Sequence, residues 1–211
     1  MNLKKTILLA VIILVLDQWS KIFIKTHFFY QEEIEVFSWF KIFFIENRGA
    51  AWGTQLSDFL PISERSAKFG LTIFRLFAIV GIAIWGYRSA LKKAPSLLLV
   101  AIALIFSGAL GNIIDSVFYG KLFTVSTPYS VATFAWESSI GGYDNFFYGR
   151  VVDMLYFPLI DTNWPDWMPW VGSKPFKFFQ PVFNIADSAI SIGVFIIIAF
   201  NKRVFPNLTR N

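Results

Sequence analysis

The sequence predicts an all-α membrane protein with four transmembrane helices, a small extracytoplasmic β element and a long extracytoplasmic loop. Hydrophobic residues make up 55% of the 211 residues, and the chain contains 25 Phe and 8 Trp. Soluble domains are less rich in apolar and aromatic side chains. Four apolar stretches approach the roughly 20 residues that a helix needs to cross a bilayer. We expect a single membrane-embedded domain over residues 1–211.

The four predicted spans cover residues of about 6–24, 69–87, 97–114 and 184–200. The first resembles a secretory signal, but no small-residue cleavage site follows its apolar core, so we interpret it as an uncleaved helix. The second contains Arg75, which is costly in the middle of a span but can reach polar surroundings near one end.

Basic residues predict the orientation of the spans. They precede the first span, separate the second from the third, and follow the fourth: Lys4, Lys5, Arg88, Lys92, Lys93, Lys202 and Arg203. Because short cytoplasmic segments are enriched in Lys and Arg, both termini are expected to be cytoplasmic. The longer segments, about 25–68 and 116–182, are then extracytoplasmic.

These two outer segments differ in composition. Residues 34–46 mix β-branched and aromatic side chains with some alternation, which predicts one or two strands. Residues 116–182 contain several Trp, Pro and Gly, a composition typical of an irregular surface at the level of the lipid headgroups.

The composition also excludes several kinds of chemistry. The chain has no Cys and a single histidine, His27, so a thiolate nucleophile is excluded and a zinc site is improbable. The net charge of +5 is not concentrated in a basic cluster with interleaved aromatics, so we expect no nucleic-acid partner. The chemistry must use carboxylates, amides, hydroxyls, Lys or Arg.

Polar residues recur in the fourth predicted span. Asn184, Asp187, Ser188 and Ser191 are spaced i, i+3, i+4 and i+7, which places them on one helix face. A carboxylate in a membrane helix is expensive, so Asp187 is a candidate for function. The alternative is a polar packing face whose N-terminal carboxylate is favoured by the helix dipole.

Two further carboxylates allow more than one interpretation. Asp115 follows GALGNII, where small residues favour close helix packing and Asn112 can hydrogen-bond across the contact. Asp153 lies in RVVDMLYF, either on the wet face of a strand or in a dry pocket that raises its pKa. Paired with Asp187, it could form an acid and base couple that shares a proton.

Two motifs are weaker when taken singly. In DQWSK, Asp17 and Lys21 form an i, i+4 ion pair in the favourable order, which indicates a structural role. In ENRGAAWG, small residues follow Asn47 and allow the backbone to approach a ligand or strand closely.

Taken in order, DQWSK, NRGAAWG, GALGNIID, VVDM and FNIADSAI resemble the successive motifs of the lipoprotein signal peptidases, also called signal peptidase II. The resemblance implies that Asp153 and Asp187 are the catalytic aspartates. It implies binding or supporting roles for Asp17, Lys21, Asn47, Gly49, Asn112, Asp115, Asn184 and Ala186.

The resemblance also implies an activity. It is aspartyl-protease cleavage of the peptide bond before the diacylglyceryl-cysteine of a prolipoprotein, at the outer face of the bacterial cytoplasmic membrane. No cofactor or metal is expected. The expected partners are the lipid-modified substrate and membrane lipid, and the chain is expected to be a monomer.

The chain departs from the family pattern at one motif position and in its loops. Ser116 stands where the family has Arg directly after the GNxxD acid, and Arg150 or Arg48 could supply a replacement cation. Restoring Arg at position 116 is expected to be tolerated. The segments between Asp115 and Asp153, and between Asp153 and Asp187, are longer than in the family.

Two other classes of protein compete with a peptidase. One is a small proton-coupled carrier in which Asp187, Asp115 and Arg75 relay ions. The other is a non-enzymatic assembly protein that docks partners on its Trp-rich loop. Four spans, no internal repeat and acids gathered at one face argue against the carrier.

Overall fold

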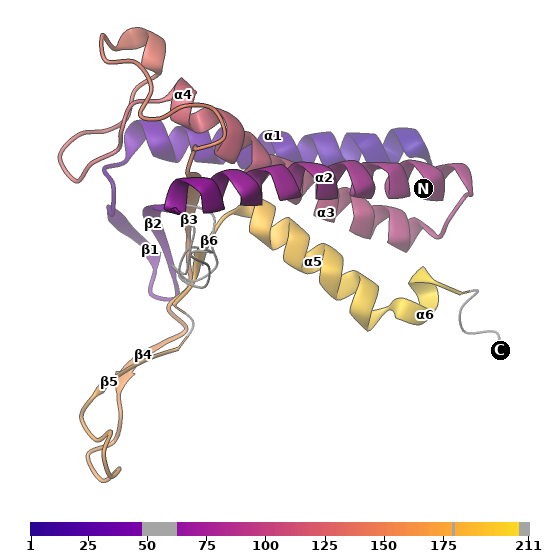
Figure 1. Ribbon diagram of the computed structural model, residues 1–211. Coiled ribbons are helices and arrows are strands. Elements are labelled where there is room, and N and C mark those ends of the chain that lie inside the picture. Colours follow the sequence, from indigo (N-terminus) through magenta and orange to yellow (C-terminus); the bar gives the residue numbers. More distant parts are fainter. Residues whose placement is uncertain (48–62, 179, 207–211) are drawn as a thin grey trace.

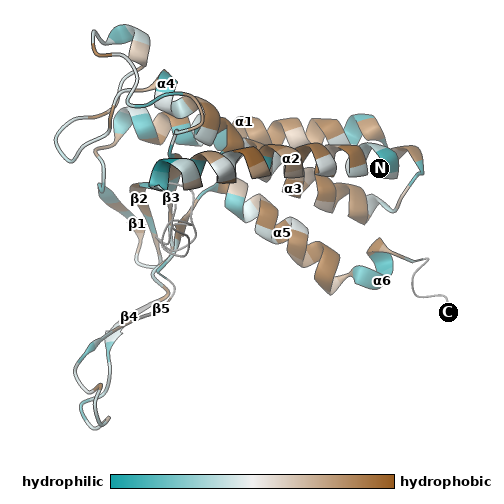
Figure 2. Cartoon of the chain, in the orientation of Figure 1, coloured by the Kyte–Doolittle hydropathy of each residue, from teal (hydrophilic) through white to brown (hydrophobic). Residues whose placement is uncertain are grey.

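The computed structural model describes residues 1–47, 63–178 and 180–206, and it combines an apolar helix bundle with a small β-sheet at one end (Figure 1). Within these described residues, three helical segments are long and apolar enough to cross a membrane: α1 (Leu3–His27), α2 (Glu64–Leu91), and α3 (Ser96–Ile114) with the turns that continue it to Leu122. They contain the first three predicted spans. Hydrophobic residues predominate along these helices (Figure 2), as a lipid environment requires.

The fourth predicted span corresponds to α5 (Ile185–Ala199), which is apolar but has only 15 residues. This is shorter than the roughly 20 residues that cross hydrocarbon as a helix. The helix begins one residue later than predicted because Asn184 is its N-cap. A short helix, α6 (Asn201–Val204), follows Phe200.

The sheet has the strand order β1-β2-β3-β6, and every neighbouring pair is antiparallel. Its strands are β1 (Glu33–Phe37), β2 (Phe40–Asn47), β3 (Val151–Tyr156) and β6 (Val182–Phe183). The prediction of strands in residues 34–46 is confirmed. The prediction that residues 116–182 are irregular is wrong for β3 and β6, because β3 pairs with β2 and β6 pairs with β3, and a sequence pattern does not reveal these partners.

The second outer segment contains two further features. After α3 the chain continues through a π-helical turn, η3 (Asp115–Tyr119), and the short α4 (Gly120–Leu122), and then a loop that includes the 3₁₀ turn η4 (Ala135–Glu137). Between β3 and β6 it forms a separate hairpin of β4 (Ile160–Asn163) and β5 (Pro175–Phe178). This hairpin projects away from the bundle (Figure 1).

One hydrophobic cluster joins the sheet to the helices. Phe44, Val152 and Met154 of the sheet pack with Ile24 of α1 and Tyr119 of η3, and all five side chains are buried. The sheet is therefore fixed on the end of the bundle. Its opposite face, which carries Asp153, is left to form the polar site.

Helix α3 is the centre of the bundle, since it packs against α1, α2 and α5. Two of its glycines allow this approach. A Cβ at Gly108 would overlap the carbonyl oxygen of Ala186, and a Cβ at Gly111 would overlap the carboxylate of Asp17. The predicted packing role of the small residues in GALGN is confirmed.

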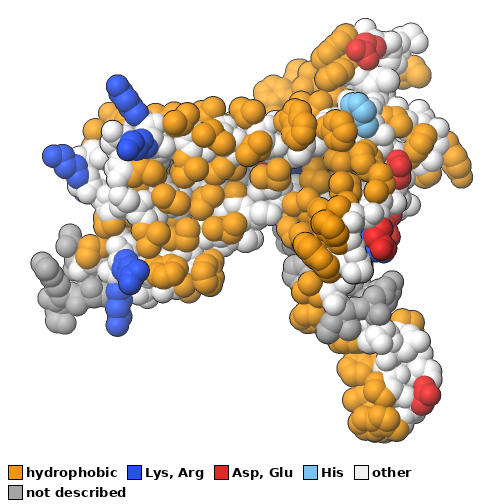
Figure 3. Space-filling model, turned by 180° about the vertical axis from the view of Figure 1, so that it is seen from behind, with side chains coloured by type: hydrophobic (Ala, Val, Ile, Leu, Met, Phe, Trp, Pro, Cys, Tyr) orange, Lys and Arg blue, Asp and Glu red, His pale blue; other side chains and the backbone are white. Residues whose placement is uncertain are grey.

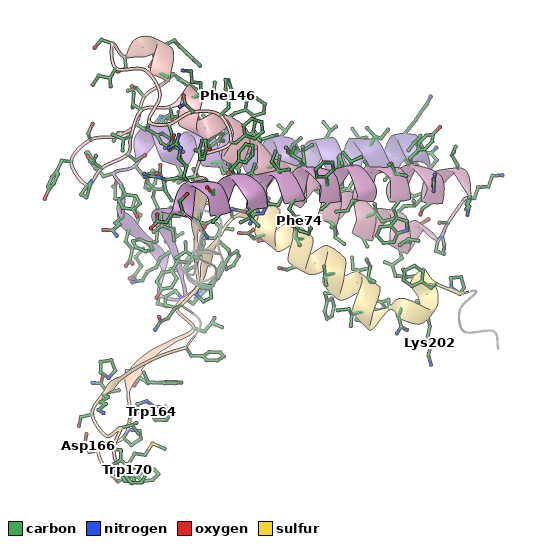
Figure 4. The ribbon with its side chains drawn as sticks, viewed as in Figure 1. Phe74, Phe146, Trp164, Asp166, Trp170 and Lys202 are labelled. Carbon is green, nitrogen blue, oxygen red and sulfur yellow. The ribbon has the colours of Figure 1, made fainter. Side chains whose placement is uncertain are left out.

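Charged residues separate along the bundle axis. On the face shown in Figure 3, Lys and Arg gather at one end of the helices, whereas Asp and Glu gather at the other end and on the sheet. Lys202 lies at the basic end (Figure 4). The polar site therefore lies at the acidic end of the bundle.

Candidate active site

A buried lysine forms the base of the site. The Nζ atom of Lys21 lies 3.0 Å from Asp17 and 2.8 Å from Asp115, and all three side chains have no exposed surface. Two carboxylates thus share one ammonium group, and α1 is tied to the end of α3. A buried charge is tolerated only when it is paired in this way.

Gln18 completes this ion cluster. Its side-chain amide donates to Asp115 at 3.0 Å, and to Asp17 and the carbonyl of Gly111 at 3.2 Å. Asp115 also accepts the backbone N–H of Val152 at 3.3 Å. Asp115 is therefore neither solvated nor a simple loop contact, because it holds β3 against the helices.

Asn112 links the ion cluster to the carboxylates on the other side of the site. Its carbonyl oxygen accepts from Lys21 at 2.8 Å, and its amide nitrogen donates to Asp187 at 2.8 Å. The amide is thereby fixed in one orientation, because a lysine can only donate and a carboxylate can only accept. Asn112 positions Asp187.

Asn184 joins β3, which carries Asp153, to α5, which carries Asp187. Its side chain accepts from the backbone N–H of Asp187 at 2.8 Å and so caps α5, while its amide nitrogen donates to Asp153 at 2.7 Å. The same nitrogen contacts Asn112 at 3.2 Å. The sequence Asn-Ile-Ala-Asp forms a capping box because Asp187 also accepts from the backbone of Asn184.

Asp153 is 2% exposed on β3, in the dry pocket that was one of its two predicted environments. Burial and the neighbouring charge of Asp187 raise its pKa to about 8, although Lys21, Asn184 and Asn47 act in the opposite direction. The side chains of Asn184 and Asn47 do so by hydrogen-bonding to the carboxylate. Near neutral pH this carboxyl group therefore holds a proton.

Asp187 has a different environment. It lies in the first turn of α5 and is half-buried. A carboxylate in the first turn of a helix is stabilised in its charged form by the helix dipole and by the free backbone N–H groups. The two carboxyl groups therefore differ in burial and in hydrogen bonding, which is the arrangement that separates an acid from a base.

A second buried ion cluster supports the sheet beside the site. Glu46 on β2 pairs with Lys25 of α1 and with Arg150 at 3.0 Å, and it accepts a hydrogen bond from Ser126 at 2.9 Å. Burial opposes the charged form of Glu46, but Lys25 and these hydrogen bonds outweigh it and lower the pKa of Glu46. This cluster fixes the loop that precedes β3.

The structure brings together most of the predicted site residues. Those that share this network are Asp17, Lys21, Asn47, Asn112, Asp115, Asp153, Asn184, Ala186 and Asp187. Ala186 takes part through its backbone N–H, which donates to Asp17 at 2.8 Å. Gly49 lies outside the described residues.

The structure also bears on Ser116, which replaces the family Arg, and on the arginines that could supply a cation in its place. Ser116 is 2% exposed and donates to the carbonyl of Asn112 at 2.8 Å, so its side chain is part of the turn. Arg150 pairs with Glu46, and Arg48 lies outside the described residues. Arg75 of α2 is half-buried, and the charge of Asp187 acts on it. Sequence reasoning placed Arg75 in the second span and gave it a role only in the alternative carrier.

Gln18 and Glu46 were also missed. Each lies directly beside a residue that the motifs mark, Asp17 and Asn47 respectively, and that adjacency was the available signal. Among the described residues, no group of three or more His, Cys, Asp or Glu has an arrangement that could hold a metal ion.

An apolar helix bundle that carries two interacting carboxyl groups at its acidic end defines a membrane protein with a carboxylate-based site. Comparison with known proteins places the chain more narrowly. The family model for signal peptidase (SPase) II matches residues 9–202. The lipoprotein signal peptidase of Porphyromonas gingivalis is 41% identical over 197 residues, which is 92% of this chain and 81% of the relative.

Two further similarities agree with this match. The lipoprotein signal peptidase of Amoebophilus asiaticus is 38% identical over 76% of this chain and 61% of the relative. A solved structure described as a bacterial membrane enzyme is 27% identical, with a TM-score of 0.58 over 99% of this chain and 93% of that chain. The chain belongs to the signal peptidase II family and is a membrane peptidase. Nothing in these comparisons supports the carrier.

Proposed function

We propose that this chain cleaves the peptide bond before the lipidated cysteine of diacylglyceryl-modified prolipoproteins, with Asp153 and Asp187 as its catalytic pair. The relatives it matches are lipoprotein signal peptidases. The observation that carries the proposal is the Asn184 side chain, which caps the helix of Asp187 and bonds to Asp153 at 2.7 Å. One amide thus sets the positions of both acids.

The two acids have different tasks in this proposal. Asp153, whose pKa is raised to about 8, enters the reaction protonated and acts as the acid. Asp187, half-buried at a helix N-terminus, enters ionised and acts as the base. The two acids act as a pair, since the charge of Asp187 raises the pKa of Asp153.

The reaction needs only water and this pair. Asp187 accepts a proton from water as the water oxygen bonds to the scissile carbonyl carbon, and Asp153 donates its proton to the carbonyl oxygen. The carbon–nitrogen bond of the resulting tetrahedral intermediate then breaks. Asp187 delivers its proton to the leaving amine, and Asp153 recovers its proton as the new carboxyl group forms.

The remaining network residues position this pair. Lys21 pairs with both Asp17 and Asp115, and through Asn112 it fixes the orientation of Asp187. Asn47 hydrogen-bonds to Asp153, and we propose Gly49 as a further part of the substrate site from the family motif.

The proposal includes an orientation in the membrane. We place both termini in the cytoplasm and the site near the outer face of the bacterial inner membrane, with α5 as a fourth span extended by α6. The separation of Lys and Arg from Asp and Glu along the bundle supports this orientation (Figure 3). We further propose that residues 1–211 form one domain that works as a monomer in contact with membrane lipid.

Purified protein and a precursor peptide test the proposal. Incubation with a diacylglyceryl-modified peptide should release the signal peptide, and the same peptide without the lipid should be cleaved far more slowly. Asp187→Asn should abolish cleavage while leaving a monodisperse profile in detergent. Turnover by Asp187→Asn at the wild-type rate would exclude the mechanism.

A further inference from the structure

The hairpin between β3 and β6 forms an arm over residues 157–178. It leaves β3 four residues after Asp153 and returns to β6, which ends directly before Asn184. In Figure 1 the arm starts at the site end of the bundle and runs across the helix axis. One end of the arm therefore continues into the strand that carries Asp153, and the other leads through β6 to Asn184.

The tip of the arm is a well-defined turn. Trp164 and Lys174 are joined by a backbone hydrogen bond of 2.9 Å, and the Trp164 ring packs on Phe176 with ring centroids 4.5 Å apart. Trp170 and Ser173 have φ values of 68° and 61°, a left-handed conformation that is costly for residues other than glycine. In this conformation the Trp170 ring is exposed.

The tip exposes large apolar side chains. Trp167 is 77% exposed and Trp170 is 91% exposed, and Figure 4 shows Trp164, Asp166 and Trp170 at the far end of the arm. An isolated two-stranded hairpin is marginally stable in water, so such side chains gain from a further contact surface. The charges of the arm balance, with two acidic and two basic residues: Asp161, Asp166, Lys174 and Lys177.

A strip of stacked aromatic rings connects the arm to the site. Phe157 at the base of the arm stacks on Phe183 at 5.5 Å and on Trp39 at 6.1 Å, measured between ring centroids. Phe183 pairs with Leu155, which lies two residues from Asp153 and therefore on the same face of the sheet. This face turns toward α5, because Asp153 bonds to the cap of that helix.

The opposite face of the sheet is charged at the same level. Lys41 pairs with Glu33 at 2.7 Å, and both side chains are partly exposed. At this level the sheet is thus aromatic on the face that carries Leu155 and Phe183, whereas the face that carries Lys41 bears an ion pair.

We propose that the arm is a membrane-contact element whose Trp167 and Trp170 rings lie among the lipid headgroups at the site end of the bundle. Tryptophan prefers this zone because its ring is apolar and its N–H needs a polar partner. The balanced charge of the arm fits a lipid interface better than a nucleic acid or a strongly charged protein. The aromatic strip links the base of the arm to the sheet face that carries Asp153.

The membrane contact also has a role in the reaction, and this role rests on the proposed function. Since the arm joins the two strands beside the site, contact of its tip with the headgroups fixes the depth of Asp153 and Asp187. The lipidated cysteine of a substrate enters at the depth of the lipid glycerol groups. The arm therefore holds the site level with its substrate.

Single cysteines test the contact directly, because the chain has no cysteine of its own. An environment-sensitive fluorophore is attached at Trp167→Cys or, as the control, at the exposed Glu35→Cys on the charged face. The proteins are placed in vesicles of phosphatidylethanolamine and phosphatidylglycerol. We expect the ratio of quenching by headgroup nitroxide lipids to quenching by iodide to be on the order of tenfold higher at position 167.

Two results would overturn the membrane contact. Equal ratios at positions 167 and 35 would place the tip in water. Quenching at position 167 between two labelled copies, unchanged by nitroxide lipids, would show that a second copy of the chain covers the tip.

Cleavage tests the purpose of the contact. The double variant Trp167→Ser/Trp170→Ser should lose about tenfold in kcat/KM in vesicles and little in detergent micelles, where depth is not defined. Glu35→Ser is the control, since Glu35 is exposed and lies outside the arm. Equal loss in both media would show that the tip acts through folding and would overturn this purpose. Absence of cleavage by the wild type would contradict the proposed function, not the membrane contact.

Discussion

The side-chain amide of Asn184 donates a hydrogen bond of 2.7 Å to Asp153, while the other end of the same amide caps the helix that begins with Ile185. A capping residue and a site residue are thus one residue. The start of α5 and the carboxylate of β3 are fixed together, so the position of Asp187 depends on the same amide.

Replacement of this amide should separate its two roles. Asn184→Ala should lower stability by about 1 kcal/mol through the lost cap, and kcat by at least about a hundredfold through misplacement of both acids. Ser188→Ala is the control, since the Ser188 hydroxyl only donates to the backbone of residue 184. Detergent thermal unfolding and peptide cleavage measure the two effects. A small loss of kcat would show that Asn184 is only a cap.

The two aspartates should behave as a unit. Asp153→Asn and Asp187→Asn should each abolish cleavage, and the double variant should be hardly worse than either single variant. Asparagine keeps the volume and one acceptor oxygen but cannot exchange the proton. Cleavage rates of monodisperse variants provide the measurement. Losses that multiply in the double variant would argue against a shared mechanism.

The pH profile should report the protonation of Asp153. Because the acid form is required and its pKa is about 8, kcat/KM should fall as pH rises through about 8. The hydrogen bond from Asn47 favours the ionised form and lowers this pKa. Asn47→Ala should therefore shift the alkaline limb to higher pH. A limb that stays in place or moves to lower pH would contradict this assignment.

The shared lysine should dominate stability. Lys21→Met leaves Asp17 and Asp115 buried without a counter-ion, which should cost about 3–5 kcal/mol. Lys121→Met, at an exposed position, should change stability by less than about 0.5 kcal/mol. Thermal unfolding of both variants in the same detergent compares them. Equal midpoints would mean that the ion cluster contributes little.

The burial of Ser116 changes the expected effect of Ser116→Arg. We expect Ser116→Arg to reduce the yield of folded protein, because the residue is 2% exposed and bonded to Asn112 within the π-helical turn. Overpacking costs about 1–3 kcal/mol, and a buried charge adds to it. Ser139→Arg, at an exposed loop position, should be neutral. Size-exclusion profiles in detergent show the difference, and a normal profile for Ser116→Arg would restore the original expectation.

The sequence by itself determined the three helices that are long and apolar enough to cross a membrane, because an apolar run of that length has few other stable states. It also indicated Asp153 and Asp187, through motifs that resemble those of signal peptidase II. The packing role of Gly108 and Gly111 followed from their size and spacing. These features depend on local composition or on short motifs, which a sequence displays directly.

Only the tertiary structure decided how the carboxylates differ. Whether Asp153 faced water or a dry pocket depended on which strand paired with β2 and on the arrival of Asn184 from 31 residues away. The sharing of Lys21 between Asp17 and Asp115 required α1 and α3 to meet. The pKa of a carboxyl group depends on burial and on nearby charges, and both are set by contacts between distant parts of the chain.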